Sequence, residues 1–270
     1  MVNQARTGLS SEAIEVRECT TIEEFDACIE LQREVFNLPD LEISPRRHLI
    51  VSRRAGGWTL GAFDGDELVG FVHQMAAVRA LNEITGYSHM MAVRREYQNR
   101  GLGALLKWKQ RQKSIDEGKT FITWTWDPMQ ARNAHFNLNR LGVVVRAYGA
   151  NFYGTDYSTS DAYDPERAPG IDSDRLFADW ELLSPRAVAL SLGQEPEGSG
   201  SPVQTIEIPP DWYELIKRDP TEARREQLRV RLEFQEAFRQ GLTCAAFERD
   251  REHPRYLLYQ IAEVRVQNDE

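Results

Sequence analysis

The chain has 270 residues, of which 41% are hydrophobic and 28% are charged, so its composition is that of a globular protein with a substantial core. Its net charge of −9 argues against general nucleic-acid binding, which depends on a basic surface. Three widely spaced cysteines, Cys19, Cys28 and Cys244, indicate a reducing compartment rather than a disulfide framework. No apolar run approaches the roughly 20 residues of a membrane span, and the N-terminus lacks a signal-peptide pattern, so we expect a cytoplasmic protein.

The N-terminal third of the chain contains patterns typical of two helices and a β-hairpin. Thr20-Thr21 before an acidic turn is a helix start, because a threonine caps the helix and acids favour its first turn. Asp64-Gly65 between two apolar, β-branched runs is a strong hairpin signal. The elements predicted here are a flexible tail at 1–12, a strand at 14–17, helices at 20–38 and 44–52, and strands at 58–63 and 68–78.

The segment from Tyr87 to Lys113 predicts a buried strand, a basic turn and a helix that begins after glycine. Residues 87–93 are mostly apolar and suit one core strand, and Gly101-Leu102-Gly103 then leads into helix-forming residues. A helix N-terminus carries unpaired N–H groups and the positive end of the helix dipole, and glycine lets a phosphate approach the backbone. We therefore expect an anion-binding turn at this point.

Several well-known site motifs do not fit the chain. A dinucleotide fingerprint needs a third small residue where Leu106 stands, and a Walker-type loop needs Gly-Lys-Ser/Thr. The five histidines are scattered without metal-ligand spacing, so no metal is expected. The Gly-x-Ser-x-Gly elbow of serine hydrolases is also absent. What remains is the pattern Gln/Arg-x-x-Gly-x-Gly/Ala at residues 98–103.

The second half of the chain predicts another strand and helix and then an added α/β portion. Residues 121–126 are aromatic and β-branched without charge, as in a buried central strand. A helix at 129–141 and a strand at 142–145 follow, and this alternation calls for right-handed parallel crossovers. The later elements predicted are a loop at 155–173, a strand at 175–182, a linker at 193–202, a strand at 205–208, a helix at 221–240 and a strand pair at 243–249 and 256–260.

Residues 98–103, Gln-Asn-Arg-Gly-Leu-Gly between a strand and a helix, resemble the pyrophosphate loop of the GNAT superfamily of acyl-CoA-dependent N-acyltransferases. Residues 133–143 resemble the family's later helix, which opens with Asn and closes with Gly before the next strand. The resemblance covers residues 14–153. It implies an α/β fold with a GNAT-like mixed, mostly antiparallel central sheet flanked by helices. The expected domains are the tail at 1–12, a GNAT-like acyl-CoA-binding domain at 13–155, a loop at 156–174 and a C-terminal α/β extension at 175–270.

The resemblance also implies the cofactor, acetyl-CoA or another acyl-CoA, which acts as a co-substrate. In the family the central strand and the next strand splay apart, and the pantetheine arm fills the gap as an extra strand. On this sequence those strands are 88–93 and 121–126. The implied cofactor-binding residues are Met91, Ala92, Val93, Gln98, Asn99, Arg100, Gly101, Leu102, Gly103, Ala104 and Asn133.

The implied reaction is attack of an amine on a thioester, which needs positioning, removal of a proton and a donor for the oxyanion. A main-chain N–H near Ala92 or Val93 fits the oxyanion donor. The candidates for the general base are His89, Glu83 and Asp127.

The residue that would protonate the departing thiolate is not at its usual position. In many relatives a tyrosine four residues before the closing glycine protonates it, and this chain has Leu138 there. Tyr148 and Tyr153 lie just downstream and are the substitutes. Unassisted departure is the other interpretation, since thiolates are modest bases.

Each candidate also has a purely structural interpretation. His89 fits a packed strand residue, and Asp127 before Pro128 fits a turn or helix cap. Glu83 fits a solvated loop acid. A solvated helix face and a basic pocket are both open for the basic residues of the helix, Lys107, Lys109, Arg111 and Lys113.

These observations together predict an N-acyltransferase that moves an acyl group, acetyl by preference, directly from acyl-CoA to a small-molecule amine. The alternatives are an N-succinyltransferase acting on an amino acid, a non-catalytic CoA-binding regulatory module and a protein acetyltransferase. Neither nucleic acid nor a membrane is expected as a partner, and a homodimer is left open.

Overall fold

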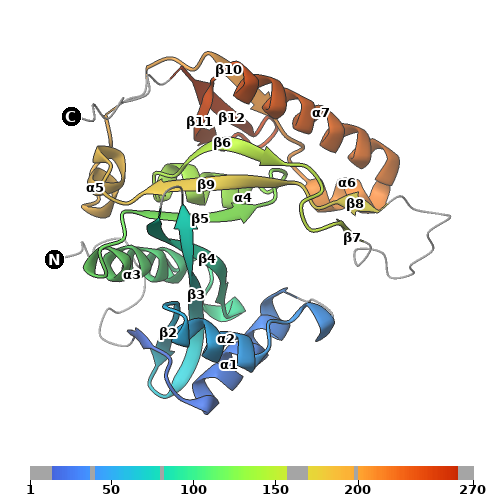
Figure 1. Cartoon of the computed structure of the whole chain (residues 1–270). Helices are drawn as coiled ribbons and strands as arrows, with labels where there is room; N and C mark the ends of the chain where they lie inside the picture. The colour runs from blue at the N-terminus through green and yellow to red at the C-terminus, as the bar shows by residue number, and fades with distance from the viewer. Residues whose placement is uncertain (1–13, 37–39, 80–81, 157–169, 198–199, 261–270) are drawn as a thin grey trace. The chain divides into compact units, whose positions relative to one another are not determined.

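The computed structural model describes residues 14–36, 40–79, 82–156, 170–197 and 200–260 (Figure 1). The chain forms two compact units. Unit 1 comprises Met1–Trp124 with Trp180–Pro196, and unit 2 comprises Thr125–Asp179 with Glu197–Glu270. Both units are discontinuous in sequence, so this division is a different one from the predicted break at 156–174. The predicted tail at 1–12 and residues 157–169 of the predicted loop lie outside the described residues.

Unit 1 is built on a sheet in which the predicted hairpin forms the middle. The strands, in their order across the sheet, are β1 (Ile14–Glu18), β2 (Trp58–Asp64), β3 (Glu67–Arg79), β4 (Glu83–Val93) and β5 (Phe121–Trp126). Neighbours from β1 to β4 are antiparallel, and β5 runs parallel to β4. β4 starts at Glu83 rather than at the predicted Tyr87, because its first residues pair with the far end of the long β3.

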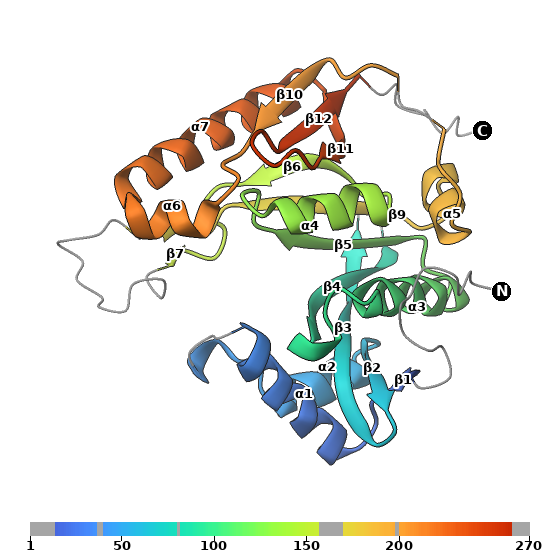
Figure 2. The ribbon, with the colours of Figure 1, turned by 180° about the vertical axis from the view of Figure 1, so that it is seen from behind.

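Helices cover both faces of this sheet (Figures 1 and 2). Because side chains alternate along a strand, Phe71 packs in a cluster with Phe25 of α1, and Val72 packs in the opposite cluster with Leu106 of α3. α2 lies on the same face as α1, since its Leu49 belongs to the cluster of Phe25. The helices of unit 1 are α1 (Ile22–Phe36), η2 (Asp40–Glu42), α2 (Arg46–Arg54), η3 (Arg95–Tyr97), α3 (Leu102–Asp116) and α5 (Pro185–Ser191).

Unit 2 contains an antiparallel set of strands in the order β9-β6-β11-β12-β10. The predicted closing strand pair and long helix are confirmed. The long helix starts where Asp219 accepts a hydrogen bond from Glu222 N (3.0 Å) and proline follows. The elements of unit 2 are α4 (Ala131–His135), η4 (Phe136–Arg140), β6 (Val144–Gly149), β7 (Thr155–Asp156), β8 (Ile171–Asp172), β9 (Arg175–Glu181), β10 (Gln204–Glu207), α6 (Trp212–Arg218), α7 (Pro220–Arg239), β11 (Thr243–Glu248) and β12 (Arg255–Tyr259).

Three predictions for the region after β5 are wrong in detail. The predicted helix at 129–141 begins at Ala131, because Asp127 holds the preceding residues in a turn through Met129 N (2.8 Å), and it ends as the π-helix η4. The predicted strand at 142–145 begins at Val144, because Gly142 has a φ of 77°. The second parallel crossover does not put β6 beside β5, since β6 pairs antiparallel with β9 and β11.

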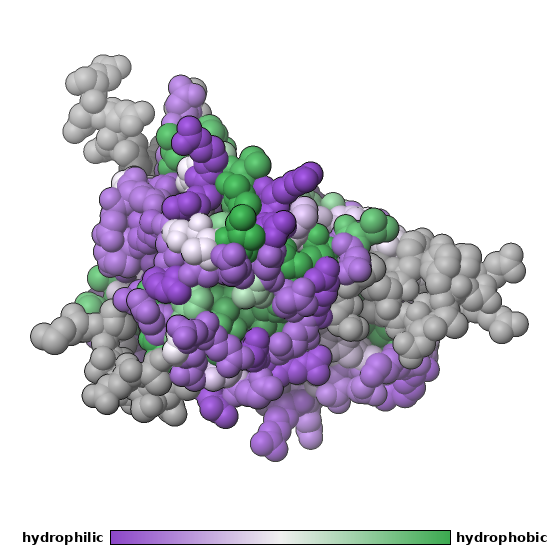
Figure 3. Space-filling view, turned by 90° about the horizontal axis from the view of Figure 1, so that it is seen from below, coloured by the Kyte–Doolittle hydropathy of each residue, from purple (hydrophilic) through white to green (hydrophobic). Residues whose placement is uncertain are grey.

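The predicted class, an α/β fold with a mixed, mostly antiparallel sheet flanked by helices, is confirmed. In the part of the chain that the structure describes, no helix combines the length and apolar character needed to cross a bilayer. Seen from below (Figure 3), the surface is mainly hydrophilic, with hydrophobic residues gathered near the middle of the view.

Candidate functional site

The loop before α3 has the backbone conformation that an anion site requires. Asn99 and Gly101 lie in the left-handed region, with φ values of 61° and 90°, and Gly101 is the N-cap residue of α3. Leu105 N donates to Gly101 O (3.0 Å), so the N–H groups before it in the first turn have no helical acceptor. That turn contains no acidic residue, and Arg100 beside it is exposed. The loop therefore presents N–H donors, a helix dipole and a positive side chain.

Two contacts join this loop to the end of β4. The side-chain amide of Gln98 donates to Val93 O (2.9 Å). A Cβ built on Gly103 lies 3.5 Å from Met91 Cε, so the start of α3 packs against the strand end. Ala92 between them is buried in the core. The predicted cofactor residues of unit 1 thus form one connected region of strand end, loop and helix start.

β4 and β5 separate partway along their length. Their parallel register runs through Gly86–Ile122 and Tyr87–Thr123, and beyond Tyr87 the described pairing of β4 is with β3 alone. We call this point, bounded by the next residues Ser88 and Trp124, the strand fork. From the fork to Val93, the edge of β4 away from β3 offers main-chain groups to a ligand.

His89 is the extra residue of a β-bulge in β4. His73 of β3 pairs with Met90 and Gln74 pairs with Ser88, so His89 has no direct partner. A bulge re-aims a side chain, and bulges are common beside active sites. His89 is exposed on the face of the sheet covered by α1 and α2, with its Nε2 3.2 Å from Ser44 Oγ.

The position of Ser44 is set by the core of α1. Ser44 N donates to Gln32 Oε1 (3.0 Å), and Gln32 Nε2 donates to Ser44 O (3.3 Å). Gln32 is itself buried on α1 and donates to Cys28 O (3.4 Å). The buried side chain of Gln32 therefore fixes the backbone of Ser44, whose hydroxyl lies opposite His89.

Three imidazoles gather around the bulge. The ring centroids are 5.3 Å apart for His48 and His89, 5.4 Å for His48 and His73, and 6.1 Å for His73 and His89. Burial and the neighbouring imidazoles lower the pKa of His73 to about 3. The His89 ring is exposed on one side only, and its partial desolvation, together with His48, lowers its pKa. His89 is thus a neutral imidazole near pH 7. Within the described ranges, no three His, Cys, Asp or Glu side chains have the arrangement of a metal site.

Lys107 of α3 reaches the strand fork from the opposite face of the sheet. Its Nζ donates to Ser88 Oγ (2.8 Å) and lies 3.7 Å from the centroid of the Trp124 ring. The residue is only 3% exposed, and burial lowers the pKa of its amine well below the ordinary value. The ring favours the charged form by about 2 kcal/mol or more, whereas burial of a charged amine costs several kcal/mol. The burial effect is the larger one, so the pKa of the Lys107 amine is lowered.

The basic residues of α3 differ in exposure, so the interpretation as a solvated face does not hold for all of them. Lys109 is exposed, as on a solvated face, whereas Lys107 and Arg111 are buried. Arg111 Nε donates to Leu182 O (2.8 Å). The solvated interpretation is thus wrong for these two residues.

Glu83 lies at the other end of β4 from the loop. It is exposed and accepts a hydrogen bond from Thr120 Oγ1 (3.2 Å). Its separation from His89 along the strand is about 20 Å at ~3.3 Å per residue. Glu83 and His89 therefore cannot accept a proton from the same bound amine. Glu83 fits its structural interpretation, that of a solvated acid.

In unit 2, Asp127 has the turn geometry of its structural interpretation. It accepts hydrogen bonds from Met129 N (2.8 Å) and Gln130 Nε2 (3.3 Å). Burial raises its pKa, against the opposing effects of the Met129 N–H and of Arg175. Asn133 is exposed on α4.

The two tyrosines proposed as acids differ in exposure. Tyr148 donates to Asp174 Oδ2 (2.6 Å), and burial raises its pKa. Tyr153 is 61% exposed, and its hydroxyl lies 3.2 Å from Thr125 Oγ1. Leu138 is fully buried and has no acid function.

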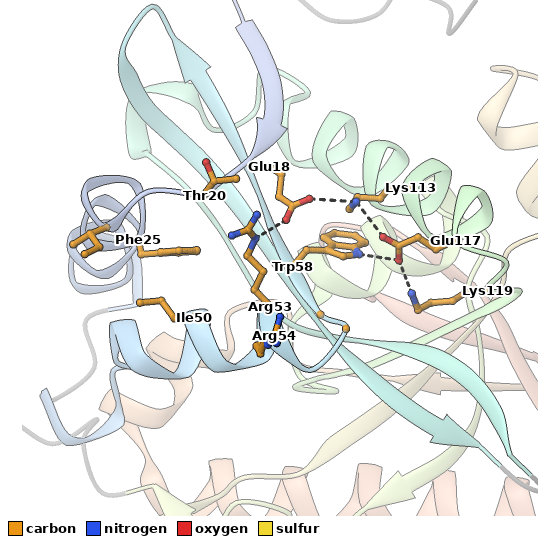
Figure 4. A pocket seen from close by; sticks show the side chains of 13 residues that line it. Glu18, Thr20, Phe25, Ile50, Arg53, Arg54, Trp58, Lys113, Glu117 and Lys119 are labelled. Atoms are coloured by element: carbon orange, nitrogen blue, oxygen red, sulfur yellow. Dashed lines mark hydrogen bonds and ion pairs between the residues drawn. The ribbon is translucent and has the colours of Figure 1, made fainter.

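Unit 1 also holds a separate pocket of about 830 Å³, to which α1, the end of α2, the start of β2 and the end of α3 contribute residues (Figure 4). Its charges are largely satisfied by each other. Glu18 pairs with Arg53 (3.0 Å) and Lys113 (3.3 Å), and Glu117 accepts from Trp58 Nε1 (3.0 Å). None of the predicted cofactor residues lines it.

Sequence reasoning missed Ser44, Gln32 and the special role of Lys107. Nothing in the sequence joins residue 44 to residue 89. Lys107 had a signal, because Gly103, Lys107 and Gln110 share one helix face with Ser114. Small and polar residues repeated at helical spacing mark a face that packs closely on a polar patch.

Residues 23–142 match a family described as the acetyltransferase (GNAT) family. No curated protein matches the chain. A GNAT-family protein from Desulfovibrio desulfuricans is 15% identical, with 63% of this chain and 99% of that chain covered and a TM-score of 0.50. An acetyltransferase candidate from Acinetobacter baylyi is also 15% identical, with coverages of 64% and 94% and a TM-score of 0.50. At these identities the likeness to solved structures concerns the fold.

Proposed function

Residues 23–142 make the chain a member of the GNAT superfamily, and from this premise we propose that it transfers an acyl group from acyl-CoA directly to the amine of a small molecule. Acetyl-CoA is the proposed donor. The observation that carries the proposal is the strand fork of β4 and β5, with an anion-binding loop at the far end of the same β4 edge. This arrangement supports a ligand with a phosphate head and an extended arm.

Donor binding uses main-chain groups for the most part. The pyrophosphate binds the N–H groups of Gly101 to Ala104, with Arg100 adding charge. The arm pairs with the open edge of β4 at Met91, Ala92 and Val93 as an added strand, which brings the thioester carbonyl to the main-chain N–H groups there. Asn133 stays a predicted contact of the arm.

We propose His89 as the general base. It is exposed at the bulge and neutral near pH 7, and it is oriented by Ser44 through Nε2. The amine proton therefore passes to Nδ1, directly or through water. The free amine attacks the thioester carbonyl carbon, and a main-chain N–H of Ala92 or Val93 stabilises the oxyanion. Because thioesters are already activated, positioning supplies much of the rate.

For the departing thiolate, the structure supports Tyr153 over Tyr148. Tyr153 has an exposed hydroxyl, whereas Tyr148 is buried and already donates to Asp174. Departure without an acid is the alternative, and it predicts that Tyr153→Phe retains full activity. If Tyr153→Phe lowers kcat and leaves KM unchanged, Tyr153 is the acid.

The experiment is release of free thiol from acyl-CoA across a panel of small amines. We expect kcat/KM to decrease at acidic pH, with a midpoint below about 6.5, because acid protonates the imidazole base. This decrease is the acidic limb of the pH profile. His89→Ala removes that limb. His253→Ala is the matched control, since His253 is exposed and pairs with Glu207, and it must keep the limb. A limb that survives in His89→Ala excludes His89 as the base.

The same panel separates the alternatives. Turnover with succinyl-CoA and an amino acid, but not with acetyl-CoA, identifies an N-succinyltransferase. Binding of CoA without turnover of any amine identifies a regulatory module, an interpretation that the buried Leu138 favours. Thiol release only with peptides identifies a protein acetyltransferase.

A further inference from the structure

Unit 1 contains a pocket that the proposed transfer reaction does not use. Its volume of about 830 Å³ lies in the range of small-molecule sites, about 300–1,000 Å³. None of the residues assigned to acyl-CoA lines it, and neither does His89 or Ser44. The pocket is therefore a separate candidate for a ligand site, and its side chains indicate the class of that ligand.

The lining of this pocket carries more positive than negative charge. Its ionisable side chains are two carboxylates and four cations, Glu18, Glu117, Arg53, Arg54, Lys113 and Lys119. Glu18 pairs with Arg53 (3.0 Å) and Lys113 (3.3 Å). Glu117 pairs with Lys113 (3.0 Å) and with Lys119. These pairs satisfy the carboxylates and leave a surplus of two positive charges, although the chain as a whole has a net charge of −9. An anionic ligand matches this surplus.

Two arginines at the end of α2 have N–H groups to offer such an anion. Arg53 donates to Glu18 through Nε, and its guanidinium makes no other hydrogen bond within the described ranges. Arg54 is exposed, and no carboxylate among the described residues pairs with it. Figure 4 shows both side chains at the end of α2, with Arg53 extended toward Glu18. The planar fork of a guanidinium matches a carboxylate, so these arginines suit a carboxylate head.

The side of the pocket formed by α1 and α2 is apolar. Ile22 and Ile50 line the pocket and are 54% and 40% exposed, whereas Phe25 between the helices and the sheet is buried. Phe25 and Ile50 lie on one side of Arg53 and Trp58 lies on the other (Figure 4). A ligand that covers the isoleucines removes apolar surface from water, which an inorganic anion does not do.

We propose that this pocket binds a small organic acid, a carboxylate with a short apolar tail. The carboxylate accepts hydrogen bonds from Arg53 and Arg54, and the tail packs on Ile22 and Ile50. Each CH₂ of the tail that is fully buried strengthens binding by about fourfold. The inference is independent of the proposed function, because no residue assigned to the donor or to proton transfer lines the pocket.

The experiment is calorimetric titration of the full-length protein with hexanoate at low ionic strength. Acetate has the same head without the tail, hexylamine has the tail with a positive head, and inorganic phosphate is an anion without a tail. We expect hexanoate to occupy a single site and to bind at least about tenfold more tightly than each of the other three. Added salt weakens the binding, because it screens the charge of the arginines.

A pair of arginine variants tests the carboxylate head. Arg54→Ala removes a charged donor, so we expect hexanoate affinity to decrease about tenfold. Arg47→Ala is the matched control, since Arg47 is exposed on the same helix and does not line the pocket. It changes the net charge by the same amount and is expected to leave the affinity unchanged.

A second pair tests the apolar side with equal changes of charge. Ile50→Asp replaces a lining isoleucine with a carboxylate, so it removes the apolar contact and repels the ligand, and we expect no measurable binding of hexanoate. Val51→Asp is the control, because Val51 is 65% exposed on the same helix and does not line the pocket. Denaturant unfolding of both variants shows that each is folded.

Three outcomes overturn the proposal. The first is hexanoate binding no tighter than that of acetate, phosphate or hexylamine. The second is an equal loss of affinity within either pair of variants, which places the ligand elsewhere or makes the effect one of net charge. The third is competition between saturating CoA and hexanoate, because hexanoate then occupies the donor site. Absence of CoA binding or of amine turnover overturns the proposed function alone and leaves this site in place.

Discussion

Replacing Gly101 with glutamate puts a carboxylate at the N-cap of α3, where the proposed pyrophosphate binds. A carboxylate about 5 Å from one phosphate charge raises its energy by about 3 kcal/mol at an effective dielectric constant of ~20. That energy weakens CoA binding about a hundredfold. The left-handed φ of 90° adds backbone strain of about 1 kcal/mol, which lowers the free energy of unfolding rather than the affinity.

The matched control is Gly118→Glu at the other end of the same helix. Gly118 has a φ of 78°, and a Cβ there meets no atom within 4 Å. It therefore adds the same charge and similar strain, far along α3 from the loop. Calorimetry with CoA, together with denaturant unfolding of both variants, measures affinity and stability separately. Equal CoA affinity in the two variants, with equal loss of stability, refutes the assignment of the loop.

Three further changes test other parts of unit 1. Ser44→Ala removes a hydrogen bond worth about 1 kcal/mol from His89, so kcat/KM falls about fivefold while calorimetric CoA affinity is unchanged; an unaltered kcat/KM contradicts the positioning role. Burial raises the pKa of Glu117, but hydrogen bonds from two lysines and Trp58 outweigh it, so the folded-state pKa is lowered. Its stabilising effect is present above the unfolded pKa of about 4.3 and is lost as pH falls through the folded pKa, so Glu117→Gln is expected to lower the unfolding free energy at pH 7 and to converge with the parent in acid. Trp180→Ala empties a fully buried site against two other tryptophan rings, each 5.6 Å away between centroids, and is expected to cost about 3–5 kcal/mol in denaturant unfolding; a cost below about 1 kcal/mol shows that the site is not packed as described.

The strand, loop and helix of the proposed donor site were predictable because they are local in sequence. Strand, loop and helix follow each other within residues 83–116, and the turn chemistry of Gly101 and the helix start depend on near neighbours alone. The hairpin at Asp64-Gly65 and the strand at 121–126 were predictable for the same reason. The helix after β5 was predicted less well, because the hydrogen bond from Met129 N to Asp127 keeps the residues before Ala131 in a turn.

The surroundings of His89, the proposed base, depended on contacts between distant segments. His89 was a candidate from its place on a strand, but the bulge that exposes it comes from the register of β4 against β3. Its partner Ser44 is brought to it by Gln32 of α1. Neither the register nor this pairing leaves a pattern in the residues around position 89.

By itself, the sequence determined the strand–loop–helix with the backbone conformation of an anion site, the likeness to an acyl-CoA transferase and the candidates for the base. Tertiary structure alone decided that Lys107, in a helix with other basic residues, ends in the fork between Ser88 and Trp124 while Lys109 points to solvent. The physical reason is that backbone turns and caps depend on neighbouring residues, whereas burial and the pKa of a side chain depend on which distant strand it meets.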